Sequence, residues 1–256
     1  METVDIVAVL PRHLDDTALA LSDRLTDRMR VGGSPSWFRL GDPFDQAGPC
    51  APHVSLFMLA VETTEVDAVV AATRALAAGL PALVAEGQYY RHNPVGAPEL
   101  YFRKTAEWIS LQRAVVAAVE PLRRGRLRDT DPAGESVAGL IGDPAQDPAR
   151  RAQLTRFGYD EITEQWDGGA TDRFNPHVTL AWPVDPEFRI DLTDLPPAAE
   201  FSGVLPGLAV YGMSRYGTCT THFGDAPFSG TPIGGFDSGN ATGRLNSHSS
   251  RQARGE

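Results

Sequence analysis

The sequence predicts an α+β protein, because short apolar runs typical of strands alternate with amphipathic segments typical of helices. The order of a strand followed by a helix opens the chain and recurs further along it. Two nearly identical five-residue segments, residues 52–56 and 176–180, also divide the chain into two comparable parts. With 256 residues, of which 42% are hydrophobic, the chain is long enough to bury a substantial core.

The first strand and helix are expected within the first 33 residues. Residues 4–10 form an apolar run that ends at Pro11, which is typical of a buried strand. Asp15 and Asp16 are suitable N-caps for the amphipathic helix that follows, and the glycines at 32–33 are expected to end it.

The next segments are predicted from the same patterns. Strands are expected at residues 37–40, 52–59, 82–90, 99–104 and 176–182. One helix is expected to start after Thr64 and to end at Gly79 in a left-handed conformation, and a second is expected at residues 108–122. Two apolar runs, residues 203–210 and 211–220, are predicted to form an antiparallel pair.

Two segments lack such periodicity. Residues 123–153 are polar and rich in Gly, Pro and Asp, so we interpret them as a loop that is an insert or a lid. Residues 229–256 consist mostly of Gly, Ser, Asn, Thr and Arg and are predicted to be a disordered tail. A single domain, residues 1–228, is therefore expected.

Composition excludes several classes of function. The net charge of −10 argues against a broad basic surface for long nucleic acids and favours a short ligand. Two cysteines, Cys50 and Cys219, match neither a disulfide scaffold nor a four-ligand zinc site, and we expect no cofactor. Without a signal peptide pattern or an 18-residue apolar run, we expect a cytoplasmic monomer that does not associate with membranes.

The near-repeat carries the strongest functional signal. Both copies read Pro-His-Val-hydroxyl-Leu, with His53 and Ser55 in the first and His177 and Thr179 in the second. Because side chains alternate faces along a strand, each histidine points the same way as its hydroxyl, while the Val and Leu point into the core. Two such strands side by side would bring two imidazoles and two hydroxyls into one cleft.

This set of groups suits phosphoester chemistry. An imidazole titrates near neutral pH, so one histidine can accept a proton from the attacking water while the other donates a proton to the leaving oxygen. The hydroxyls can donate hydrogen bonds to the non-bridging phosphate oxygens, and the scheme needs no metal. A lone His-x-Ser would more often be an ordinary strand feature, but the matched pair reverses that judgement.

These residues resemble the two motifs of the 2H phosphoesterase superfamily, which has two His-apolar-Ser/Thr-apolar segments. The superfamily includes proteins similar to the bacterial 2′-5′ RNA ligase and cyclic phosphodiesterases. The resemblance implies two pseudo-symmetric α/β lobes with antiparallel sheets that flank a central cleft. It also implies that His53 and His177 are the catalytic acid and base, and that Ser55 and Thr179 bind phosphate. The insert at 123–153 is not part of the motif pattern and could reshape the pocket that receives the substrate.

Other side chains are weaker candidates for contacts with the substrate. Trp182 lies five residues after His177, where it could stack on a base or pack in the core. The remaining candidates could contact a phosphate or a base, although a solvated strand end is the simpler reading of each. They are Tyr90, Tyr211, Arg215 and Tyr216.

The sequence therefore predicts a metal-independent phosphodiesterase. Its expected substrate is a small nucleotide, an oligonucleotide or an RNA end that carries a cyclic phosphate or a 2′-5′ or 3′-5′ phosphodiester. Two alternatives stay open: a module that binds a nucleotide or an RNA end without catalysis, and an RNA ligase. Which histidine is the acid depends on the direction of the reaction.

Overall fold

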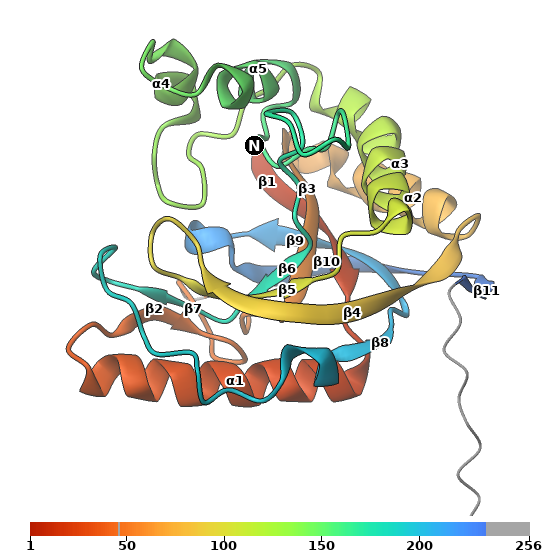
Figure 1. Ribbon diagram of the computed structural model, residues 1–256. Helices are drawn as coiled ribbons and strands as arrows, with labels where there is room; N and C mark the ends of the chain where they lie inside the picture. Colours follow the sequence, from red (N-terminus) through yellow and green to blue (C-terminus); the bar gives the residue numbers. More distant parts are fainter. Residues whose placement is uncertain (46, 234–256) are drawn as a thin grey trace, which may run out of the picture.

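The computed structural model describes residues 1–45 and 47–233, and its strands form two main sheets (Figure 1). In the first sheet, the strand order is β10 (Cys219–Pro227), β9 (Gly207–Met213), β1 (Glu2–Val9) and β3 (His53–Val61). All three pairings in this sheet are antiparallel. The strand that contains the first histidine motif, β3, therefore lies at an edge.

The second sheet is built around a long strand, β4 (Pro81–His92). The order is β11 (Gly230–Ile233), β4, β5 (Pro98–Phe102) and β6 (His177–Thr179), and β8 (Ser202–Val204) also pairs with β4. Only β11 runs parallel to its neighbour among these pairings. Two further strands, β2 (Ser36–Arg39) and β7 (Ala181–Pro183), form a separate antiparallel pair.

The two histidine motifs lie at the edges of different sheets. β3 hydrogen-bonds to β1, and β6 hydrogen-bonds to β5, while β3 and β6 contact each other without pairing. This arrangement confirms the expected fold of two lobes whose largely antiparallel sheets face one another. The motif strands are adjacent, as predicted, but they are the facing edges of two sheets and do not belong to one sheet.

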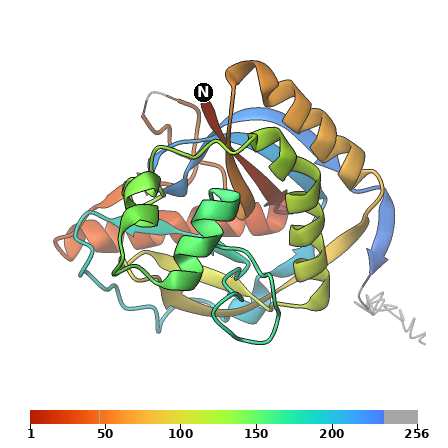
Figure 2. The same cartoon turned by 90° about the horizontal axis from the view of Figure 1, so that it is seen from above.

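Helices cover the sheets from different sides (Figures 1 and 2). α1 (Arg12–Val31) packs against β2 and β7, whereas α2 (Val66–Ala77) and α3 (Ala106–Arg123) pack against the first sheet and each other. α4 (Val137–Gly142) and α5 (Pro148–Phe157) lie together, far from α1. Short 3₁₀ turns, Thr63–Glu65, Ala198–Glu200 and Arg215–Gly217, connect the other elements.

The apolar residues of both motifs belong to the main core. Val54, Leu56, Val178 and Leu180 are each at most 1% exposed, and all four are part of one continuous apolar cluster. The His and hydroxyl residues between them are only partly buried. The predicted alternation of buried and cavity-facing residues is therefore confirmed in both motifs.

Two expected helix ends are wrong. α1 begins at Arg12 with Pro11 as its N-cap residue, ahead of Asp15 and Asp16, and Leu14 in its first turn is buried in the core. Pro11 suits this place, since a helix start does not use the missing N–H and the Pro11 carbonyl accepts the first helical bonds. Gly79 is not left-handed, because α2 ends in a turn whose residue Ala78 keeps a right-handed conformation.

The antiparallel pair near the C-terminus is confirmed, but its boundaries differ from the prediction. Tyr211 lies inside β9, and the connection to β10 is the turn that contains Arg215–Gly217. Tyr216 in this turn has a φ of 61°, a conformation that bulky residues seldom adopt. The turn was not predicted at this place, because Tyr216, and not a glycine, takes the left-handed conformation.

The insert is not a plain loop. Residues 123–153 contain α4 and most of α5, whose N-caps are Ser136 and Asp147. The helices were missed because α5 carries no regular apolar stripe. It is held by ion pairs of Arg150 with Asp131 and Asp160 at 3.1 and 2.5 Å, in place of a large apolar face.

The tail is only partly described. Residues 230–233, expected to be disordered, form β11, which pairs with β4 next to Pro81 and Leu83. Backbone hydrogen bonds to β4 hold residues 230–233 in a strand, and amino-acid composition gives no information on such bonds. The rest of the expected tail, residues 234–256, lies outside the described residues. Within the described part of the chain, no helix is both long enough and apolar enough to span a membrane.

Candidate active site

The four motif side chains line one small cavity between the two sheets. Its volume is about 80 Å³. The lining residues are His53, Ser55, Met58, Asn93, Glu99, Pro132, Glu161, His177, Thr179, Trp182, Tyr216 and Gly217. The expected meeting of two imidazoles and two hydroxyls is therefore present in the structure.

Both imidazoles are oriented by the same type of hydrogen bond. Nδ1 of His53 donates to the carbonyl oxygen of Ala51 at 2.7 Å, and Nδ1 of His177 donates to that of Asn175 at 2.7 Å. A carbonyl oxygen can only accept, so Nδ1 carries a hydrogen in each ring. Nε2 is thus the nitrogen of each ring that can exchange a proton with a bound molecule, and the Gly217 backbone forms a further hydrogen bond to the His53 imidazole.

The two histidines have different electrostatic surroundings. Burial lowers the pKa of His53 to about 4, and the nearby His177 acts in the same direction. Burial also acts to lower the pKa of His177, but the carboxylates of Glu99 and Glu161 outweigh it and raise this pKa above 6.5. Nε2 of His177 lies 3.7 Å from Oε1 of Glu99. At neutral pH His53 is therefore neutral, and His177 is the more readily protonated of the two.

Each motif hydroxyl donates a hydrogen bond to a buried carboxyl group. Oγ of Ser55 donates to Oδ2 of Asp5 at 2.6 Å, and Oγ1 of Thr179 donates to Oε1 of Glu99 at 3.5 Å. Asp5 comes from β1 and Glu99 from β5, the strands that pair with the two motif strands. Each lobe thus contains the motif strand and a paired strand that supplies a carboxyl group.

The two carboxyl groups are held differently. Burial raises the pKa of Asp5 to about 7, partly offset by the hydrogen bond from Ser55. Glu99 accepts hydrogen bonds from Nδ2 of Asn93 at 2.8 Å and from the Tyr101 hydroxyl. The Glu99 side chain is therefore held in place beside His177 by its hydrogen bonds, whereas Asp5 has one oxygen with no partner in the described structure.

The insert contributes to the wall of the cavity. Pro132 accepts a hydrogen bond from the backbone N–H of Tyr216 at 3.0 Å, which joins the insert to the turn after β9. Glu161, which follows α5, lines the cavity and accepts a hydrogen bond from the Tyr159 hydroxyl at 3.2 Å. Arg128 is 2% exposed and packs its guanidinium over the ring of Tyr159. The insert is thus packed into the molecule through buried residues.

Aromatic rings border one side of the cavity. The rings of Trp37 and Tyr216 stack with centroids 5.1 Å apart, and Trp182 lies 5.7 Å from Tyr216. Trp37 is 43% exposed. Among the weaker sequence candidates, Trp182 and Tyr216 therefore line the cavity. Trp37, which was not predicted from the sequence, stacks on Tyr216 but does not line the cavity itself.

The other three weaker candidates do not line the cavity. Arg215 forms an ion pair with Asp45 at 3.1 Å on the outer side of the Tyr216 turn. Tyr211 packs edge-on against His222, and Tyr90 packs against the core. These placements follow from strand registers, which a single sequence does not reveal.

Sequence reasoning missed the acidic residues of the site. Asp5 is a lone charge within the apolar run 4–10, and Glu99 similarly begins an apolar run. A charged residue inside a buried strand is rarely tolerated without a partner, so both positions carried a usable signal. Glu161 lies in a polar loop and offered no such signal.

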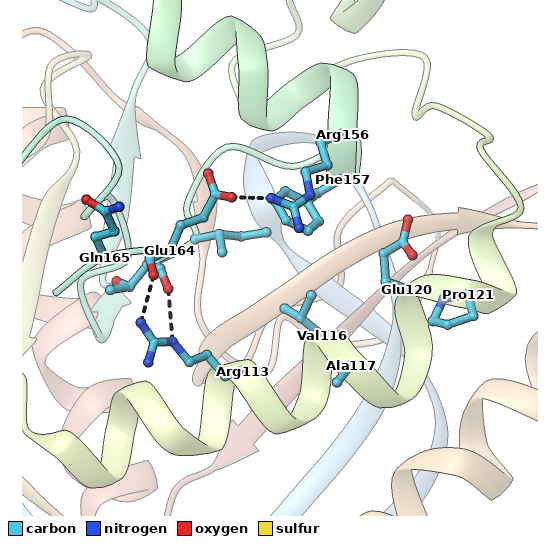
Figure 3. A pocket seen from close by; sticks show the side chains of 11 residues that line it. Arg113, Val116, Ala117, Glu120, Pro121, Arg156, Phe157, Glu164 and Gln165 are labelled. Carbon is cyan, nitrogen blue, oxygen red and sulfur yellow. Dashed lines mark hydrogen bonds and ion pairs between the residues drawn. The ribbon is translucent and has the colours of Figure 1, made fainter.

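A larger cavity lies elsewhere (Figure 3). It has a volume of about 640 Å³ and lies between α3 and the segment that follows α5. Arg113 donates to the backbone carbonyl of Glu164 at 2.8 Å, and Arg156 pairs with the Glu164 carboxylate at 2.5 Å. Its two arginines are thus already bonded, and no histidine is among the described residues that line it.

Comparisons with known proteins identify the fold. No family model and no curated protein matches the chain. Among solved structures, TT0787 of Thermus thermophilus is 18% identical, with 89% of this chain and 98% of that chain covered and a TM-score of 0.50. E. coli LigT complexed with 3′-AMP is 14% identical, with 89% and 98% covered and a TM-score of 0.44. A structure described as a phosphoesterase is 14% identical, with 90% and 99% covered and a TM-score of 0.43. The chain therefore has the fold of TT0787, a two-lobed α+β fold that agrees with the one implied by the resemblance to the 2H phosphoesterase superfamily.

Proposed function

We propose that the protein is a metal-independent phosphoesterase of the two-histidine type. Its substrate would be a small nucleotide or an RNA end with a cyclic phosphate or a phosphodiester. The observation that carries this proposal is the pair of imidazoles in one cavity, each with Nδ1 bonded to a carbonyl and Nε2 left for proton transfer. The paired hydroxyls and the aromatic border support it.

In the proposed reaction His53 is the base and His177 is the acid. Nε2 of His53 accepts a proton from water as the water oxygen bonds to phosphorus, and Nε2 of His177 donates a proton to the ribose oxygen as the P–O bond breaks. Glu99, 3.7 Å from His177, supports this assignment, because a nearby carboxylate favours the charged form of an imidazole. Exchange of both protons with solvent restores the starting state.

The two motif hydroxyls and the aromatic rings at one side of the cavity would hold the substrate. Ser55 and Thr179 donate to carboxyl groups in the described structure, so each O–H rotates away from its carboxyl group to donate to a phosphate oxygen. No lysine or arginine is among the described residues that line the cavity, so protonated His177 would be the counter-charge. This favours a singly charged diester. A base would lie outside the small cavity, over Trp182 and Tyr216.

Turnover in the presence of EDTA tests the function. The purified protein would be incubated with 2′,3′-cyclic nucleotides, 3′,5′-cyclic nucleotides and 2′-5′ oligoadenylates, and the products would be resolved by phosphate position. A product that requires both His53 and His177 supports the proposal. Tight binding by calorimetry without any product would favour the binding module, and joining of RNA ends would favour the ligase.

Replacing Glu99 by Gln is expected to shift the pH profile. His177 must be protonated to act as the acid, so activity falls as pH rises through its pKa. The Glu99 carboxylate raises that pKa, and Glu99→Gln removes the charge while it keeps the shape. The alkaline limb of kcat/KM should therefore move to lower pH.

The matched control for this shift is Glu187→Gln, which removes an exposed acid outside the cavity. It should leave the profile where it is in the wild type. An unchanged alkaline limb in Glu99→Gln would remove His177 from the role of acid.

A further inference from the structure

A mixed group of metal-ligand side chains lies at the back of the cavity. Asp5, His53 and Cys219 each offer one ligand atom, and these atoms all lie within 4.8 Å of one another. Asp5 and Cys219 are fully buried, whereas His53 lines the cavity. A carboxylate oxygen, an imidazole nitrogen and a thiolate are the ligand types that zinc takes in proteins.

One ligand atom in this group has no partner. Oδ1 of Asp5 is buried without a hydrogen bond in the described structure, while Oδ2 accepts from Ser55 and lies 3.9 Å from Sγ of Cys219. The Arg128 guanidinium, whose charge acts on Asp5, donates through Nε to the carbonyl of Gly158 and through Nη1 to the sulfur of Met58, and its Nη2 is also buried without a partner in the described structure. Buried polar atoms are normally satisfied, so the free carboxyl oxygen points to a ligand that belongs there.

The backbone presents the imidazole and the thiol together. Ala51 accepts the hydrogen bond from Nδ1 of His53 at 2.7 Å, and its own N–H donates to the carbonyl of Cys219 at 2.9 Å. Ala51 is thus hydrogen-bonded both to the His53 side chain and to the Cys219 backbone. Metal-binding histidines usually donate their second ring N–H to a carbonyl or carboxylate, which is the geometry of His53. Nε2 is then the atom that would bind the metal.

We propose that Asp5, His53 and Cys219 form an inhibitory zinc site that opens into the catalytic cavity. Zinc would bind Nε2 of His53, Sγ of Cys219 and a carboxylate oxygen of Asp5, and the Ser55 hydroxyl or a water would complete four ligands. The thiol proton, and any proton on the carboxyl group, passes to solvent as the bonds form. The inhibition rests on the proposed function, because zinc on Nε2 would occupy the atom that accepts the proton. The binding of zinc does not depend on the proposed function.

Cobalt(II) tests the binding without any substrate. Added to the metal-free protein, Co²⁺ should give the near-ultraviolet absorption of a thiolate-to-cobalt bond. Cys219→Ala should abolish this band. Cys50→Ala is the matched control, since Cys50 is also buried but lies outside the ligand group, and it should keep the band. No band in the wild type, or an equal band in Cys219→Ala, would overturn the site.

Zinc tests the inhibition. Each variant is compared with its own activity in EDTA, and the zinc concentration for half inhibition should rise at least about tenfold in Cys219→Ala and stay near wild type in Cys50→Ala. Equal zinc sensitivity in wild type and Cys219→Ala would overturn inhibition through this site. A cobalt band in a protein without turnover would reject the proposed function alone, whereas turnover without a band would reject the zinc site alone.

Discussion

Replacing His53 or His177 by Ala is expected to lower kcat by about 100- to 10,000-fold for each, the usual range for loss of one proton-transfer group. His53→Ala removes the acceptor of the water proton. His177→Ala removes both the proton donor and the only cationic side chain proposed to face the phosphate. KM should change less than kcat in His53→Ala, because a neutral base contributes little to binding. Steady-state kinetics with EDTA present measure both effects.

His13→Ala is the matched control, because His13 lies on α1 outside the cavity. It should keep wild-type kcat. Both cavity variants should keep the wild-type unfolding temperature within a few degrees, since their side chains are only partly buried. Wild-type turnover in either cavity variant would remove that histidine from the chemistry.

Leu56→Ala is expected to destabilise the protein by about 2–5 kcal/mol, the usual range for a fully buried leucine. Leu56 is 0% exposed and lies in the first motif, next to the cavity-facing Ser55. The substitution removes apolar contacts of the main core and leaves a cavity, because the neighbouring strands relax only partly. Urea unfolding followed by circular dichroism would measure the change.

Val31→Ala provides the comparison for an exposed apolar residue, because Val31 is 82% exposed at the end of α1. Its effect should stay within about 0.5 kcal/mol. A comparable loss in both variants would mean that Leu56 does not contribute as a core residue. The variants at His53 and Leu56 therefore test the cavity-facing side and the core-facing side of β3 separately.

Much of the fold and the central residues could be predicted from the sequence, because strand periodicity and the near-repeat are local signals. His53 and His177 were selected by alternation within five-residue segments, and the structure places them in one cavity. Local sequence patterns could not predict that β3 and β6 are the facing edges of two sheets. This arrangement depends on pairings between strands that are far apart in the chain, such as β1 with β9.

The acidic residues and the insert show where local patterns fail. Asp5 and Glu99 accept hydrogen bonds from the motif hydroxyls because β1 and β5 pair with the motif strands. The insert looked like a loop because its stability comes from buried polar groups such as Arg128 and Asp131. Polar residues that are buried through partners in distant segments carry no periodic signature.

A double-mutant cycle tests the central claim, that the two histidines act as one unit on the same phosphorus. kcat would be measured in EDTA for wild type, His53→Ala, His177→Ala and the double variant, with the cyclic nucleotide that the wild type turns over. Because residues that act in one step are strongly non-additive, the double variant should be about as slow as the slower single variant. Losses that multiply in the double variant would show two independent effects and contradict the account.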